Sequence, residues 1–309
     1  MSLKILDKIK KYNQFPNTYI EVIGKKMGGI DNLKAVIRGK KRIILQDMPP
    51  IAFDKHGRLI RPNGTTHNVC DANKDFYVQQ PQINFAERLE LLRKHLHGKL
   101  VVHISSSEYE DRAKKILQRI EGDEQMNGVL NGPYTISVLP RLSKKMIANY
   151  GLLLEEIFLP AVAKAYTSIF APKPFKNYRA GTLAGQVNIV EGSRHETLLQ
   201  KALSGDVVFL HALQPLQGYS ILAQREIMQF LPDDVLLGGA IDTSCSLIQF
   251  TPELVRDAKT PAYDCSALQW QSADYSLYFY AVGVELGCDG QSNLGDASDY
   301  YSGGLLFVG

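Results

Sequence analysis

The stretch GQVNIVEGSRHETLLQKALSGDVVFLHALQPLQGYSILAQREIMQFLPDDVLLGGAIDTSC, residues 185–245, alternates between strand-like and helix-like segments. Apolar segments at 186–190, 207–213 and 235–241 are typical of strands, and the segments between them have helical spacing of apolar residues. Such alternation is typical of parallel sheets, whose ligands bind beyond the carboxyl ends of the strands. The stretch therefore predicts an α/β fold with a site at those ends.

The alternation extends in both directions from this stretch. Further elements are expected, in chain order, as a basic helix over 4–12, a strand over 18–23, a helix over 30–37, a strand over 42–46, a hairpin over 51–60, a helix from Asn84 to Gly98, a strand over 100–104, a helix from Ser106 or Ser107 to Gly122, a strand over 134–139, a long helix from Ser143 that Pro160 kinks, and strands over 275–282 and 305–308. The predicted fold is a mixed, largely parallel sheet with helices on both faces, followed by an aromatic, glycine-rich C-terminal section.

A change of composition divides the chain near its middle. Residues 172–181 contain Pro172, Pro174 and Gly181 and predict a boundary loop. An N-terminal α/β region over 4–171 and a C-terminal α/β region over 182–309 would flank it. A single continuous domain is the alternative that the sequence leaves open.

Length and composition predict a folded, soluble globular protein. The chain has 309 residues, of which 45% are hydrophobic and 22% are charged. No apolar run approaches the roughly 20 residues that a membrane span needs, and no signal peptide is visible. The four cysteines form no CxxC pair and no disulfide scaffold, so a cytoplasmic location is expected.

Charge is unevenly distributed along the chain. Residues 1–45 carry eleven Lys or Arg and three Asp or Glu, whereas residues 231–309 carry two Lys or Arg and eleven Asp or Glu. One hypothesis is a non-catalytic interaction protein that uses its basic N-terminus and its acidic, Tyr-rich C-terminus to dock onto macromolecules. The alternative is that the charges are solvated or that the two ends face one another.

The turn at 191–195 is the first candidate site. If a helix begins near Ser193, the backbone N–H groups of Gly192 and Ser193 favour an anion, and Arg194 can bind a carboxylate or phosphate. His195 can transfer a proton near neutral pH. The competing interpretation is that Ser193 only caps its own helix.

His211 and Asp242 are the further catalytic candidates. His211 lies near the carboxyl end of an apolar strand, and Asp242 follows the predicted strand 235–241. An aspartate in that position can orient a histidine. The competing interpretations are a hydrogen-bonded core histidine and an aspartate that caps a turn.

Asp264-Cys265-Ser266 resembles the Asp-Cys-Ser box of papain-like cell-wall peptidases over these three residues. The resemblance implies a cysteine hydrolase with Cys265 as an alternative nucleophile at the start of a helix. In that family the histidine follows the cysteine, but no histidine follows His211 here, so only a permuted order with His195 or His211 fits. Residues 269–271 are also more typical of a strand than of a helix.

The remaining motifs of the chain indicate no specific function. The acidic segment with Asp289, Asn293, Asp296 and Asp299 lacks the calcium-loop pattern and predicts a surface loop or lid. Phosphate-loop, dinucleotide-binding and zinc-binding motifs do not occur, so no cofactor and no metal is predicted. The basic residues of 38–42 lack the aromatic residues or recognition helix typical of nucleic-acid binding, so neither nucleic acid nor membrane is an expected partner.

The leading hypothesis is a cytoplasmic enzyme or binding protein that acts on a small anionic molecule. Arg194 and the 192–195 backbone would hold the anion, His195 or His211 would transfer protons, and Asp242 would orient the histidine.

Overall fold

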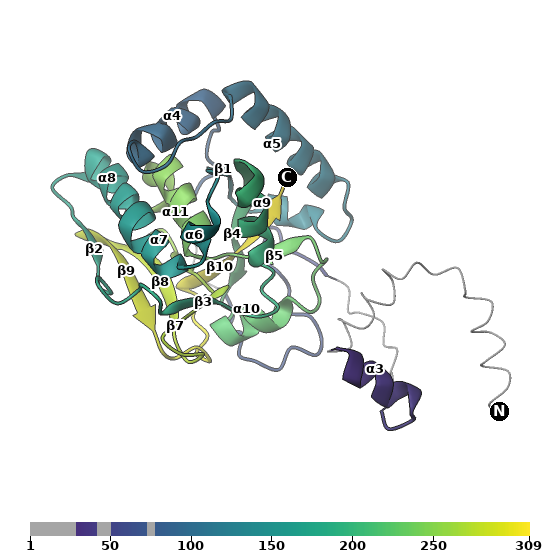
Figure 1. The fold of residues 1–309 in the computed structure, drawn as a ribbon. Coiled ribbons are helices and arrows are strands. Elements are labelled where there is room, and N and C mark those ends of the chain that lie inside the picture. Colours follow the sequence, from purple (N-terminus) through teal and green to yellow (C-terminus); the bar gives the residue numbers. More distant parts are fainter. Residues whose placement is uncertain (1–28, 42–50, 73–77) are drawn as a thin grey trace. The chain divides into compact units, whose positions relative to one another are not determined.

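The computed structural model describes residues 29–41, 51–72 and 78–309 (Figure 1). The helix expected over 4–12 and the strands expected over 18–23 and 42–46 lie outside these residues. The chain divides into two compact units, residues 1–48 and residues 49–309. Helix α3 (Ile30–Ile37) belongs to the first unit and has the bounds that the sequence predicts. The larger unit contains the sheet and all the candidate site residues that the sequence predicts, from Gly192 to Cys265.

A mixed sheet of eight strands forms the centre of the larger unit. The strands have the order β1-β4-β10-β6-β8-β9-β2, and β5 pairs with β10. Their bounds are β1 (Tyr134–Leu139), β2 (Phe175–Asn177), β4 (Val207–Gln217), β5 (Val235–Leu237), β6 (Ala262–Asp264), β8 (Ser276–Val282), β9 (Glu285–Gln291) and β10 (Tyr301–Val308). Two further strands, β3 (Val187–Ile189) and β7 (Leu268–Trp270), form a separate antiparallel pair.

The sheet is mixed, as predicted, but the expectation that it is largely parallel is wrong. In the described residues only the pairs β10–β6 and β2–β9 are parallel, and the other five pairs are antiparallel. A tight connection such as the one from β8 to β9 can only join antiparallel neighbours. The strand expected over 186–190 is β3, which lies outside the main sheet. The prediction that helices cover both faces is not confirmed.

Helix α11 (Ala240–Gln249) lies in the interior of this unit. All ten of its residues are buried, and it contacts β1, α4 and α8, so it lies between the sheet and the outer helices (Figure 1). The other helices described in this unit are α4 (Phe85–Leu96), α5 (Ser106–Glu121), η1 (Asn127–Asn131), α6 (Lys144–Ile147), α7 (Tyr150–Leu153), η2 (Leu154–Phe158), α8 (Leu159–Phe170), α9 (Glu196–Ser204), α10 (Ile221–Ile227) and α12 (Thr251–Leu254). Because α11 is enclosed, its polar side chains must find partners inside the protein.

Local signals place several helix ends correctly. The side chain of Asn84 accepts a hydrogen bond from the amide of Glu87 at the start of α4, and Gly122 ends α5. The predicted long helix is instead divided into α6, α7, η2 and α8. The π-helical turn η2 directly precedes Pro160, which has no N–H to continue an α-helix.

The strand expected over 100–104 does not form. The carboxylate of Asp206 accepts hydrogen bonds from the amides of His103 (2.5 Å) and Ile104 (2.8 Å), so these groups do not pair with a strand. The boundary at 172–181 stays a prediction, and β1, which precedes it in the chain, pairs with β4, which follows it. In the described part of the chain, no helix combines the length and the apolar character needed to cross a membrane.

Candidate functional site

The three predicted catalytic side chains lie together inside the protein. His195 Nε2 is 3.7 Å from Asp242 Oδ1, and His195 is close enough to His211 to contribute to the lowered pKa of His211. The parallel arrangement expected to unite them is absent, because β10 lies between β4 and β5 and is antiparallel to both. His211 and Leu236 both pair with Leu306 of β10, so β4 and β5 still run in the same direction on its two sides.

His195 has a defined hydrogen-bonding role. Its Nδ1 lies 3.3 Å from the carbonyl oxygen of Leu237, which can only accept, so Nδ1 carries the proton. The hydroxyl of Tyr150 lies 3.4 Å from Nε2 and accepts a hydrogen bond from the amide of Ile241 at 3.1 Å. Tyr150 therefore joins the histidine to the first turn of α11.

Asp242 is in the first turn of α11 and not at the end of a strand. Strand β5 ends at Leu237, before the predicted end at 241, and both carboxylate oxygens of Asp242 accept hydrogen bonds from the amide of Gly239 (3.0 and 3.1 Å). Asp242 therefore caps its own helix, which is the competing interpretation that the sequence left open.

His211 belongs to a second set of buried hydrogen bonds. Its Nδ1 lies 3.2 Å from the hydroxyl of Ser246 on α11. That hydroxyl is also 3.2 Å from the hydroxyls of Thr135 and Ser137 on β1. A Cβ atom at Gly304 of β10 would overlap the ring of His211, so the imidazole occupies space that only glycine leaves free.

Burial shifts the pKa values of all three side chains toward their uncharged forms. His195 and Asp242 are 0% exposed and His211 is 1% exposed. Burial lowers the pKa of His195 to about 4 and the pKa of His211 to about 3. Burial also raises the pKa of the Asp242 carboxyl well above its usual value. In this structure a substrate does not reach these groups.

The 192–195 turn does not present the anion site that was expected. Helix α9 begins at Glu196, and the amide of Ser193 donates to the carbonyl oxygen of Val190 (3.2 Å). The guanidinium of Arg194 donates instead to four carbonyl oxygens, those of Met228, Leu231, Pro232 and Val235. Its Nη2 also lies 3.4 Å from the carboxylate of Asp233. Arg194 therefore joins the end of α10 to β5, and its Nη1 and Nη2 donors are occupied.

Gly192 provides the bend in this turn. Its φ is +81°, which is the left-handed region that favours glycine, and a Cβ atom there would meet no other atom within 4 Å. Glycine is therefore favoured at this position by the backbone conformation and not by close packing.

Cys265 lies in the turn between β6 and β7 and does not begin a helix. Its thiol is 0% exposed, and burial raises its pKa well above its usual value, although the hydroxyl of Thr243 is hydrogen-bonded to it. A nucleophilic cysteine needs access and a lowered pKa. The residues after it form β7, in agreement with the strand-like sequence at 269–271.

An open polar cavity of about 340 Å³ lies directly beside Cys265, and we call it the Asp264 pocket. Its polar lining comes from β6, β9, β10 and the connection between the last two strands. The principal lining residues are Tyr219, Asp264, Gln291, Asn293, Asp296 and Tyr301. Asn293 and Asp296 are exposed whereas Asp264 is only 3% exposed, so the carboxyl lies at the inner end of a cavity that reaches solvent.

Two glutamine amides hold the Asp264 carboxyl. Gln224 Nε2 donates to Oδ2 (2.8 Å), and Gln291 Nε2 donates to Oδ1 (3.0 Å). The Gln224 amide is itself oriented, because its Nε2 also donates to the carbonyl oxygen of Tyr219 and its Oε1 accepts from Ser266 Oγ. A Cβ atom at Gly303 would overlap that Oε1, so glycine is required there.

Burial raises the pKa of Asp264 to about 7, although the two amides oppose the shift. A carboxyl that titrates near neutral pH can donate a proton and take it back. The connection over 292–300 forms one wall of the pocket and is tethered at several points. The carbonyl oxygen of Leu294 accepts from the amide of Leu222 (3.0 Å), and that of Gly295 accepts from Asn68 Nδ2 (2.8 Å).

Sequence reasoning did not single out Asp264, Gln224 or Gln291. In the sequence, Asp264 stands out only as a neighbour of Cys265, and the acidic segment that forms the pocket wall predicts only a surface loop or lid. Asp264 is the last residue of the three-residue strand β6, which the sequence did not predict. The two glutamines belong to no motif.

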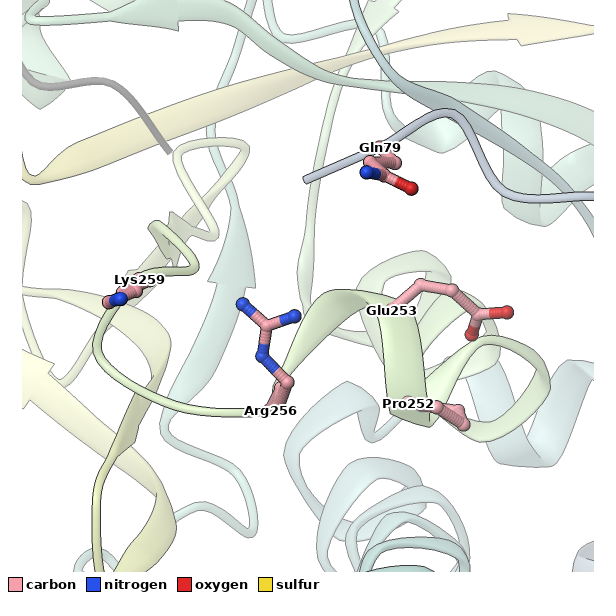
Figure 2. Close-up of a pocket in the computed structure, with 5 residues that line it drawn as sticks. All are labelled: Gln79, Pro252, Glu253, Arg256 and Lys259. Atoms are coloured by element: carbon pink, nitrogen blue, oxygen red, sulfur yellow. The ribbon is translucent and has the colours of Figure 1, made fainter. Parts of the chain in front are cut away.

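A second cavity, of about 460 Å³, lies beside α12 (Figure 2). It is lined by Gln79, Pro252, Glu253, Arg256 and Lys259. Figure 2 shows the carboxylate of Glu253 pointing away from Arg256. Glu253 Oε1 is 2.5 Å from Nη2 of Arg88, and Arg256 Nε is 3.0 Å from the carboxylate of Asp257. Because these charges have partners within the protein, this cavity offers less chemistry than the Asp264 pocket.

No group of three or more metal-binding side chains occurs within residues 29–41, 51–72 and 78–309. The chain matches no family model, no curated protein and no solved structure. The geometry of the two sites is therefore the basis for a functional proposal.

Proposed function

We propose that this protein is an enzyme that uses Asp264 as its general acid and base, on a small molecule bound in the Asp264 pocket. The observation that carries the proposal is a buried carboxyl at the inner end of an open cavity, with both oxygens held by amides and a pKa near neutral. Acid–base catalysts need this combination of access, fixed position and a pKa near the working pH.

The lining of the pocket favours an uncharged or cationic substrate. Among the described residues, no lysine, arginine or histidine lines it, whereas Asp264 and Asp296 do. This proposal replaces the small anionic ligand expected from the sequence, because the guanidinium of Arg194 is already occupied by carbonyl oxygens. Amide, carboxyl and phenol groups in the lining suit a ligand rich in hydrogen-bonding groups.

In this proposal the buried cluster of His195, His211 and Asp242 stabilises the fold and takes no part in the reaction. Its members are almost completely enclosed, and each has a partner inside the protein. It joins α11 to β4 and β5 close to the strand that also borders the pocket.

Carbon-13 NMR of the aspartate carboxyls tests the proposal without a substrate, with Asp264→Asn used to assign the resonance. We expect Asp264 to titrate near pH 7, and a ligand that stabilises the protein in a thermal-shift screen to bind with a pH dependence that Asp264→Asn lacks. The screen would contain polyols, amides, amines and carboxylates. An Asp264 carboxyl that is fully ionised at about pH 5 would contradict the proposal.

A further inference from the structure

A row of five tyrosines crosses the sheet beside the Asp264 pocket. We call it the tyrosine row, and its members are, in spatial order, Tyr178, Tyr280, Tyr278, Tyr301 and Tyr300. The ring centres of Tyr280 and Tyr278 are 5.3 Å apart, those of Tyr278 and Tyr301 are 5.6 Å apart, and those of Tyr301 and Tyr300 are 5.7 Å apart. The hydroxyls of Tyr178 and Tyr280 are hydrogen-bonded to one another. The rings therefore form a continuous series.

The tyrosine row lies at the surface and leads into the pocket. Tyr178 is 47% exposed, and the other four tyrosines are partly exposed. Tyr301 belongs both to the row and to the lining of the Asp264 pocket. The ring of Tyr280 lies against β9 at Gly287, where a Cβ atom would be 2.5 Å from its Cε1. Glycine at this position thus allows the ring to lie close to the sheet.

The charges near the tyrosine row are paired with one another. Arg179 Nε is 2.6 Å from Asp289 Oδ1, and Lys176 Nζ is 2.6 Å from Glu285 Oε2. The pocket at the end of the row contributes Asp264 and exposes Asp296. A polyanion would meet these carboxylates, and Lys176 and Arg179, the described cations beside the row, are already paired.

We propose that the substrate is an uncharged oligosaccharide, which lies along the tyrosine row and places one sugar in the Asp264 pocket. Sugar rings have apolar C–H faces that pack on aromatic rings, and their hydroxyls suit the amides and carboxyls of the pocket. The inference rests on the proposed function, because the reaction uses Asp264. Its carboxyl gives a proton to the glycosidic oxygen as the C–O bond breaks, and the resulting carboxylate takes a proton from the water that adds to the anomeric carbon.

The test measures binding by calorimetry with full-length Asp264→Asn, which retains the pocket but lacks the acid. The probes are cellohexaose, xylohexaose, maltohexaose and chitohexaose with the matching disaccharides, together with a single-stranded hexathymidylate. We expect one hexasaccharide to bind more tightly than its disaccharide, because the longer chain reaches the tyrosine row. Hexathymidylate should not bind.

Variants of the row identify the surface. Tyr278→Ala and Tyr280→Ala should each weaken hexasaccharide binding by roughly tenfold, whereas the phenylalanine variants should retain it, because they keep the ring. Tyr275→Ala is the matched control, since Tyr275 is 37% exposed and lies outside the row. The chain-length comparison needs no row variant and therefore does not depend on how these variants fold.

Three outcomes would overturn the inference: no hexasaccharide binds, the alanine variants bind as well as the parent, or hexathymidylate binds instead. Failure of the proposed function is a separate result. It appears as an Asp264 carboxyl that does not titrate near pH 7 in the unmodified protein, which is measured with no saccharide present.

Discussion

Replacing Asp264 with asparagine should change how stability depends on pH. The substitution keeps the size and planarity of the side chain and removes its titration. The Gln291 amide can rotate to accept a hydrogen bond from the new NH₂ group. In the folded protein the pKa of Asp264 is about 7, compared with 3.8 for a free side chain. A difference of about 3 pH units corresponds to about 4 kcal/mol.

The sign follows from proton binding in the two states. Below about pH 3.8 the carboxyl is protonated in both the folded and the unfolded chain. Between about pH 3.8 and about pH 7 only the folded chain keeps the proton, so its stability falls by about 1.4 kcal/mol per pH unit. Above about pH 7 the loss is complete. Relative to the parent, Asp264→Asn should therefore gain about 4 kcal/mol between about pH 4 and about pH 8.

Equilibrium urea unfolding, followed by fluorescence, measures this difference. Trp270 is the only tryptophan of the chain and is 4% exposed, so its emission reports unfolding of residues 49–309. Contributions from other titrating groups are common to both proteins and cancel in the difference. Asp296→Asn is the matched control, because Asp296 lines the same pocket but is exposed. A difference for Asp264→Asn that stays constant within about 0.5 kcal/mol over this range would refute the reasoning.

Three further predictions concern the buried cluster and the 192–195 turn. The pKa of His211 is about 3 in the folded state, so its stabilising contribution is present above about pH 6.5 and is lost as the pH falls. In urea unfolding, the unfolding free energy of the parent relative to that of His211→Gln should fall by about 3 kcal/mol by about pH 4.5. A difference that does not change with pH would contradict burial of His211 in its neutral form. Gly304→Ala should lower the unfolding free energy by about 3 kcal/mol, because its Cβ atom would overlap the buried His211 ring, whereas Gly283→Ala should have little effect because its Cβ atom meets nothing within 4 Å. Arg194→Gln should destabilise the protein by about 2 to 3 kcal/mol, because the guanidinium binds carbonyl oxygens, and should leave any thermal shift caused by anions unchanged. A stable variant whose melting temperature no longer responds to anions would support the hypothesis that Arg194 binds an anion.

The sequence predicted those elements whose signals are local. The cap at Asn84, the strand over 134–139 and the core of β4 follow from residues a few positions apart, and the structure has all three. The direction of strand pairing was wrong, because it depends on β10, the last strand of the chain. β10 pairs with β4 on one side and with β5 and β6 on the other, and no local pattern in the sequence encodes those distant pairings.

The sequence predicted that His195, His211 and Asp242 lie close together, but the structural reason that it gave for their proximity differs from the one in the structure. The three residues meet because β4 and β5 run in the same direction on either side of β10, and not because they are parallel neighbours. The Asp264 pocket could not be predicted in this way. Burial raises the pKa of its carboxyl to about 7, and the two amides that hold the carboxyl lie more than 25 positions away in the chain, so neither condition is visible locally.

Two consecutive glycines of β10 connect the buried cluster to the pocket. Successive residues of a strand face opposite sides of a sheet, and the register of β10 against β4 shifts between Gly303 and Leu305. A Cβ atom at Gly303 would overlap Gln224, which holds Asp264, and one at Gly304 would overlap His211. The backbone of one strand is therefore in close contact with polar groups on both of its sides. Since neither side has spare volume, the position of His211 determines where β10 lies, and β10 in turn determines the position of the amide that orients the Asp264 carboxyl.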